Sequence, residues 1–172
     1  MVIIDTETFI SANRQTFHGG FVFDYSLSKK LMLQPQFLYS GRGGVFGEDV
    51  KTVYRYHSIE MPLNIVYRIE VGEHGRFFLG GGPDLGFNLS GQPFQTDYPV
   101  NIIDIELGSG ETDTRRVDMG LNVLAGYEFK KRWFISANDN RGLTTWFNNS
   151  ATAGKWKSNV LAFSVGYFLV RK

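Results

Sequence analysis

Residues 17–27 read FHGGFVFDYSL, and this stretch decides the fold because large apolar side chains recur at every second position. The positions between them hold small or polar residues, such as Gly20, Asp24 and Ser26. Successive side chains of a β-strand point to opposite faces, so one face of this strand is apolar and the other is polar. The apolar face is formed by Phe17, Phe21, Phe23, Tyr25 and Leu27.

The same alternation recurs along the chain and predicts seven strands. Each is ~10 residues long or more, which is enough for a tilted strand to cross a bilayer. No run of ~18 apolar residues is present, so we expect no transmembrane helix. The predicted strands are 17–27, 31–41, 56–70, 76–89, 116–129, 133–143 and 158–170.

The connections between these strands alternate in length. Short links lie at 28–31, 71–75 and 130–132, and long segments lie at 42–55, 90–115 and 144–157. In an up-and-down outer-membrane barrel the short turns face the periplasm and the long loops face outward, whereas the Greek-key crossings of a sandwich do not give this order. The sequence therefore predicts one all-β domain, an antiparallel transmembrane β-barrel in the bacterial outer membrane.

The number of strands raises a question about the N-terminal region. Seven strands start the chain outside, so residues 5–16 are expected to form an external loop, and 2–4 the stub of a first strand. Bacterial barrels have even strand numbers, and a bilayer does not tolerate an open sheet edge. We therefore expect the native gene to encode a signal peptide and a further strand upstream. The alternative is that residues 1–10 form an irregular strand.

Composition excludes several classes of function. Lys and Arg number 18 against 17 for Asp and Glu, so nothing indicates a nucleic-acid surface. Cysteine is absent, which excludes disulfides and thiolate metal sites. The glycine-rich stretch 80–84 lacks the Lys and Ser or Thr of a phosphate loop, so no nucleotide is expected. The three histidines lie on separate segments, and we predict neither a metal site nor a cofactor.

Five segments resemble a known family. They are LSKKLMLQPQFLYSGRGG, SIEMPLNIVYRI, FFLGGGPDLGFNLSG, DMGLNVLAGYEF and NVLAFSVGYFL, and the resemblance covers residues ~17–170. In this order they resemble the porin-like outer-membrane β-barrel family that includes PorT-type proteins. The resemblance implies an eight-stranded barrel without a defined activity, whose first strand is largely missing from this chain. Family members usually end on an aromatic residue, whereas Leu169, Val170, Arg171 and Lys172 follow Phe168 here.

The polar side chains that alternate with the apolar ones point into the barrel, and they define a candidate site there. Eight strands leave a lumen barely wider than its own side chains, so polar groups there must bond to one another or to trapped water. We expect a structural network of carboxylates and amides around Arg68, with a proton or cation path as the alternative. The predicted network consists of Asp24, Gln34, Gln36, Glu60, Asn64, Arg68, Asp84, Asn88, Asp118, Asn122, Glu128 and Asn138.

Two further patterns concern the outer face. Aromatic residues cluster near both ends of the strands, with Phe168 at one end and Trp146 at the other, and predict two girdles at the headgroup level. Asp139 and Arg141 occupy positions of strand 133–143 that point outward. Either this end of the strand projects above the hydrocarbon, or a bulge shifts the register. The sequence alone does not decide between these two.

The sequence gives little support for a catalytic function. His57 and Ser58 lie near the external rim, where some small barrels carry lipid-modifying serine and histidine residues, but no third group is identifiable. We therefore predict that the protein is not an enzyme.

The sequence predicts a membrane scaffold or interaction module that acts through its three long loops. Besides the lipid bilayer, a protein partner is expected at these loops, and alternation over 100–107 would extend the strands into a projecting hairpin that binds by β-addition. The alternatives are a narrow channel and a soluble lipocalin-like carrier with the apolar face turned inward.

Overall fold

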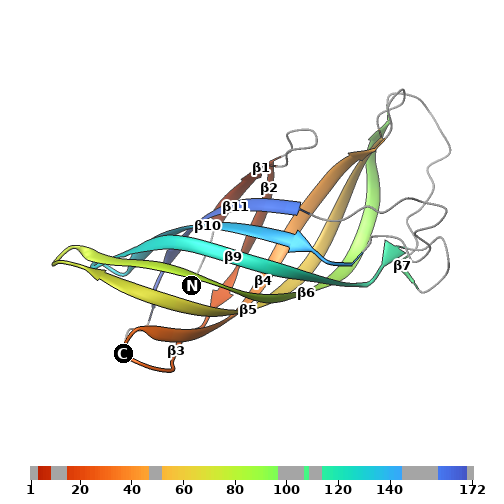
Figure 1. The fold of residues 1–172 in the computed structure, drawn as a ribbon. Coiled ribbons are helices and arrows are strands. Elements are labelled where there is room, and N and C mark those ends of the chain that lie inside the picture. Colours follow the sequence, from red (N-terminus) through yellow and green to blue (C-terminus); the bar gives the residue numbers. More distant parts are fainter. Residues whose placement is uncertain are drawn as a thin grey trace.

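The computed structural model of the chain describes residues 4–8, 15–46, 52–96, 107–108, 114–144 and 159–169. Eight antiparallel strands close a ring in the order β1–β2–β4–β5–β6–β9–β10–β11, and β11 returns to β1 (Figure 1). Their bounds are β1 Ile4–Thr8, β2 Gln15–Val22, β4 Leu31–Phe46, β5 Thr52–Val71, β6 Gly75–Thr96, β9 Val117–Phe129, β10 Trp133–Gly142 and β11 Asn159–Tyr167.

Three short strands complete the sheet structure. β3, Tyr25–Ser26, continues the line of β2 along β4. β7, Leu107–Gly108, and β8, Thr114–Arg115, form a separate parallel pair. The predicted antiparallel barrel is confirmed. Among the described residues no helix is long and apolar enough to span a membrane.

The N-terminal region differs from expectation. Residues 5–8 belong to a strand and not to a loop: Ile4 pairs with Val165 of β11, and Glu7 pairs with Thr16 of β2. β1 has only five residues and is the shortest strand of the ring. It forms because the facing edges of β11 and β2 would otherwise leave backbone groups without partners, which a bilayer cannot supply.

Three neighbouring strands extend beyond the rest of the barrel. The β4–β5 ladder continues to Phe46 and Thr52, and the β5–β6 ladder continues to Thr96 (Figure 1). The expected loops at 42–55 and 90–115 are therefore wrong in part, since residues 42–46, 52–55 and 90–96 are strand. Most of 100–107 and of 144–157 lies outside the described residues.

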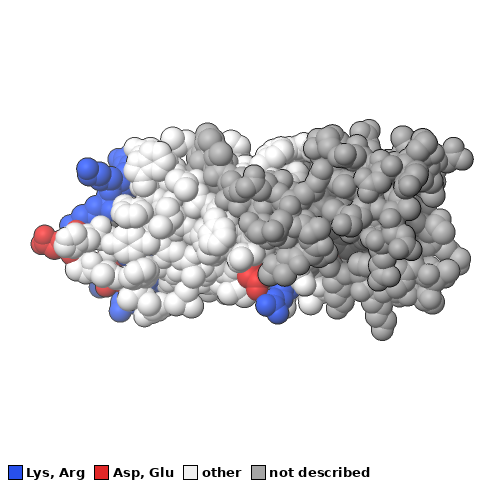
Figure 2. Space-filling model, turned by 90° about the horizontal axis from the view of Figure 1, so that it is seen from above, with Lys and Arg blue, Asp and Glu red and all other residues white. Residues whose placement is uncertain are grey.

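The outer surface of the ring is apolar. In β11 the exposed and buried residues alternate strictly, with Leu161, Phe163 and Val165 outward and Val160, Ala162 and Ser164 inward. On the face shown in Figure 2, charged side chains gather at the end formed by the short turns, and the described surface beyond it is white apart from one small acidic and basic group. Apolar groups therefore face outward, contrary to the alternative of a lipocalin-like carrier.

Strand β10 keeps a regular register with both neighbours, from Phe134 opposite Glu128 to Gly142 opposite Gly120. No bulge displaces Asp139 and Arg141, which form an ion pair on the outer face with 3.0 Å between Arg141 Nε and Asp139 Oδ2. The uncertainty in this strand is thus resolved in favour of a charged pair toward the long-loop end.

The lumen contains an apolar cluster, although the sequence analysis described the inward face of the strands as polar. Met32, Leu38, Val66, Phe78, Leu124 and Phe134 pack together inside the ring, with Val22 and Phe168 against them. Phe168 therefore does not belong to the aromatic girdle, because its ring lies 5.2 Å from that of Phe134. Glycines make room for these rings: a Cβ on Gly126 would clash with Phe78 Cζ, and one on Gly166 would clash with Phe134 Cζ.

Candidate functional site

An ion-pair network fills the lumen near the short turns. Arg68 on β5 binds Asp24 with 2.5 Å between Nη2 and Oδ2, and its Nε lies 3.6 Å from Glu128 Oε2 on β9. Arg76 on β6 holds the other carboxylate oxygen of Glu128, with 2.6 Å between Nη2 and Oε1. Gln34 Nε2 donates to Asp24 Oδ1 over 2.9 Å. Four strands and the segment after β2 are thus joined across the lumen.

A second group of contacts lies farther toward the long loops. Asn122 Nδ2 donates to Asn64 Oδ1 over 3.0 Å, and Ser58 Oγ donates to Glu60 Oε1 over 3.3 Å. Asn140 donates to Asp84. Near the outer rim, Thr144 donates to Asp118, and Asn88 Nδ2 donates to the carbonyl of Arg115 over 2.8 Å. Polar groups at successive depths therefore bond to protein across the barrel.

Most of the predicted network lies inside the ring. The buried members are Gln34, Gln36, Glu60, Asn64, Arg68, Asp84, Asn122 and Glu128. The half-buried members are Asp24, Asn88, Asp118 and Asn138. The structure does not join them into one cluster, because Asn88 and Asp118 bond near the outer rim, apart from the ion pairs at the short-turn end.

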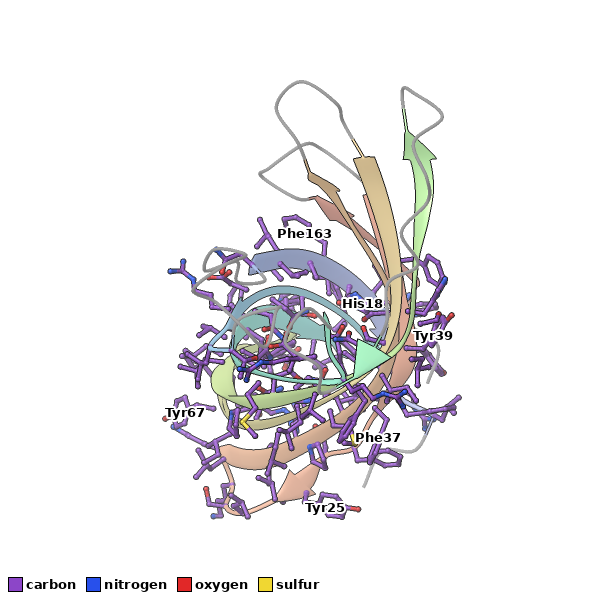
Figure 3. The ribbon with its side chains drawn as sticks, turned by 90° about the vertical axis from the view of Figure 1, so that its right-hand side faces the viewer. His18, Tyr25, Phe37, Tyr39, Tyr67 and Phe163 are labelled. Atoms are coloured by element: carbon purple, nitrogen blue, oxygen red, sulfur yellow. The ribbon has the colours of Figure 1, made fainter. Side chains whose placement is uncertain are left out.

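The sequence analysis missed several members of the lumen. His18 on β2 is only 5% exposed, and its Nε2 shares a hydrogen bond of 3.0 Å with Ser164 Oγ on β11 (Figure 3). Asn138 Nδ2 also donates to Ser164 Oγ, over 3.2 Å. Arg76 and Asn140 complete this set. The two-residue alternation that placed their neighbours inward also places His18, Arg76, Asn140 and Ser164 inward, so the signal was present in the sequence.

Two small cavities lie in the lumen on either side of His18, with volumes of about 20 and 30 Å³. Both are lined by His18, Gln36 and Asn138. A cavity of this size admits about one water molecule. The buried histidine and serine therefore have no room for an organic substrate between them. Among the described residues no group of three acidic or histidine side chains is placed to hold a metal.

The outer face carries another histidine. His57 on β5 stacks on Tyr39 of β4, with ring centroids 5.8 Å apart, and its Nδ1 shares a hydrogen bond of 2.7 Å with the Tyr39 hydroxyl. Ser58, by contrast, is buried in the lumen beside Glu60. The adjacent residues His57 and Ser58 thus point to opposite faces, and the pairing considered from sequence does not form.

The closed ring, the apolar outer surface and the filled lumen define a transmembrane β-barrel of the outer-membrane class. The family model of the outer membrane protein beta-barrel domain matches residues 5–148, and the chain belongs to this family. The protein is accordingly located in the bacterial outer membrane, with the lipid bilayer around its apolar face. No curated protein matches the chain.

Among solved structures, the outer membrane enzyme PagL is similar to this chain, with a TM-score of 0.59 and 12% identity over 95% of each chain. At this identity the likeness concerns the fold alone. It nevertheless corrects the expectation that the protein is not an enzyme, because a barrel of the same shape is one. The expectation rested on the lack of an identifiable third group beside His57 and Ser58, and a motif that is not recognised in the sequence is no argument against catalysis.

Proposed function

We propose that the barrel anchors a projecting sheet that binds a protein partner at the cell surface. The observation that carries this proposal is the unequal length of the ladders. Pairing of β4 with β2 ends at Gly41 and Phe17, and pairing of β6 with β9 ends at Phe87 and Val117. Among the described residues, β4 continues beyond Gly41 paired only with β5. β6 also continues along β5, and there its Asn88 N–H still donates to the Arg116 carbonyl over 2.8 Å.

The free edge of β4 is the better docking surface of the two. An extended edge strand offers unpaired N–H and C=O groups to which another strand adds. The free part of β6 contains Pro93, which has no N–H to donate, and a bulge interrupts the neighbouring ladder between Val53 and Tyr54. The free part of β4, residues 42–46, contains no proline. We therefore assign the partner strand to the edge of β4.

Site-specific photo-crosslinking in cells tests this proposal. A photoreactive amino acid at positions 43–46 is expected to give one protein adduct of constant mass, and positions 161 and 163 on the lipid face serve as matched controls. Gly43→Pro and Gly44→Pro provide a second criterion: successive N–H groups point to opposite edges, so one of them removes a donor from the free edge and abolishes the adduct. The absence of a protein adduct, or an adduct that neither proline affects, contradicts the proposal.

The filled lumen bears on the channel alternative. The two cavities measure only about 20 and 30 Å³, and apolar side chains such as Phe134 and Val160 line them together with polar groups, which supports a filled lumen. Planar-bilayer recordings of the folded chain are therefore expected to show no current above background. We also retain the narrower resemblance to PorT-type proteins as part of this proposal; it is supported by the motifs of the strands.

A second candidate function is catalysis on lipid at the outer face. It is favoured by the Tyr39–His57 pair, because a hydroxyl bonded to Nδ1 orients an imidazole for general acid–base work. Similarity to the outer membrane enzyme PagL supports it at the level of the fold. Incubation with vesicles of outer-membrane lipid, followed by mass spectrometry, is expected to show products that His57→Gln abolishes. Identical lipid spectra with and without protein exclude this candidate.

A further inference from the structure

Two groups of aromatic side chains, together called the aromatic patch, lie on the outer face at the short-turn end, one on β6 and β9 and the other on β10 and β11. The ring of Tyr127 lies 4.8 Å from Phe77 and 4.8 Å from Phe129, and Trp133 lies 5.1 Å from Tyr167. Gly75 lies close to the first group, since a Cβ there would clash with the Glu128 carbonyl oxygen and lie 2.9 Å from the Tyr127 hydroxyl. Trp133 is 51% exposed and Phe77 is 52% exposed, so the patch faces the surroundings of the barrel.

A basic turn adjoins this patch. Lys130, Lys131 and Arg132 connect β9 to β10, all three are exposed, and Phe129 and Trp133 flank them directly. The turn is fixed in place: the Arg132 N–H donates to the Phe129 carbonyl over 3.2 Å, and the Phe168 N–H donates to the Arg132 carbonyl over 2.9 Å. Arg132 Nη1 also donates to the Leu169 carbonyl over 3.2 Å.

The backbone conformation of Arg132 in this turn is one that arginine seldom adopts. Arg132 has φ 67°, a left-handed conformation in which glycine or asparagine is usual. The next short turn along the sheet differs in charge, because Glu70 and Glu73 lie beside the β5–β6 connection. Cations are thus present on two short turns of this end, at Lys29 and Lys30 and on the β9–β10 turn, and the β9–β10 turn is the one that adjoins the aromatic patch.

We propose that Lys130 and Lys131, together with the aromatic patch, bind an anionic phospholipid of the periplasmic leaflet. The short turns of this class face the periplasm, and the basic turn begins where the apolar surface ends, which is the depth of the lipid phosphates. Juxtamembrane lysines attract anionic headgroups. The exposed rings beside them pack against the glycerol and upper acyl chain, which a free phosphate ion lacks. The inference depends on the membrane location of the barrel and not on the proposed partner binding.

Fluorescence quenching by brominated lipid tests this site. The chain has three tryptophans, and replacing Trp146 and Trp156 by phenylalanine leaves Trp133 as the reporter beside the basic turn. The full chain is folded into phosphatidylcholine vesicles that contain a fixed fraction of brominated phosphatidylglycerol or brominated phosphatidylcholine. We expect phosphatidylglycerol to associate at least about three-fold more strongly.

The variant Lys130→Gln/Lys131→Gln is expected to bring this ratio close to one. Lys29→Gln/Lys30→Gln, on the exposed β3–β4 turn, is the matched control and should leave the ratio at Trp133 unchanged. Heat-dependent gel mobility verifies that each variant is folded, and the single variants Lys130→Gln and Lys131→Gln replace the double one if it does not fold. Equal quenching by both lipids in the wild-type background overturns the proposal. So does a ratio that survives loss of both lysines, or one that the control abolishes equally.

Discussion

Arg68 is the position at which the lumen network is most sensitive to substitution. Its guanidinium joins Asp24 at 2.5 Å and Glu128 at 3.6 Å, and the side chain of Glu128 is only 3% exposed. Replacing Arg68 by methionine preserves most of the volume but leaves two carboxylates without this cation. Breaking a buried pair in this way costs about 3–5 kcal/mol of unfolding free energy.

The structure places the expected loss near the lower end of that range. Glu128 keeps Arg76 at 2.6 Å, and Asp24 keeps the hydrogen bond from Gln34 at 2.9 Å. The side chain of Asp24 is also 18% exposed, so water screens part of its charge. We therefore expect Arg68→Met to lower the unfolding free energy by roughly 3 kcal/mol.

Urea unfolding of the barrel in phospholipid vesicles, followed by tryptophan fluorescence, measures this loss. Combining Arg68→Met with Asp24→Asn removes one of the stranded charges, and the double-mutant cycle is expected to show a coupling of at least about 1 kcal/mol. Arg141→Met is the matched control, because its ion pair with Asp139 is on the surface and its side chain is 73% exposed. A loss below about 1 kcal/mol for Arg68→Met, or strictly additive single variants, refutes the network as a stabilising element.

Two further predictions use the same unfolding measurement. Gly126→Ala should destabilise by about 1–3 kcal/mol, because its Cβ would clash with the Ile135 carbonyl oxygen and with Phe78 Cζ, whereas Gly86→Ala should be tolerated, since its nearest neighbour is Asp118 Cβ at 3.6 Å; equal losses would show that the β10 backbone and the Phe78 ring both shift freely. Arg132→Gly should be more stable than Arg132→Ala by about 1 kcal/mol, because both variants lose the bond to Leu169 and only glycine adopts φ 67° without strain. Equal stability of these two variants would contradict that assignment of strain.

The sequence predicted the strands well because a two-residue period has a direct geometric meaning. Phe163 outward and Ser164 inward follow from parity alone, as does the inward orientation of Arg68. The same rule does not say which of the inward apolar residues pack together, so the cluster around Val66 and Phe78 was missed. Phe168 was assigned outward because aromatic residues near strand ends usually belong to a girdle, whereas its ring packs on Phe134 inside.

The contacts that the sequence could not supply are those that depend on register. Which strand faces β11 is decided by closure of the ring, and β1 was mistaken for a stub and a loop because five residues carry too little periodicity to identify a strand. The bond between His18 and Ser164 joins residues 146 positions apart, and no local pattern predicts it. The extension of β4, β5 and β6 likewise depends on cross-strand pairing and not on composition.

Closure of the ring through β1 also constrains how the protein folds. Ile4 pairs with Val165, so this ladder joins the first and the last strand of the ring. Contacts of such separation pay a large loop-closure entropy before they contribute any stability, which makes folding slow. Because β11 completes both the ring and the bond to His18, a chain still lacking it has an open sheet and no stable place in the bilayer. Insertion of this barrel is therefore expected to be a concerted, late event that awaits the whole chain.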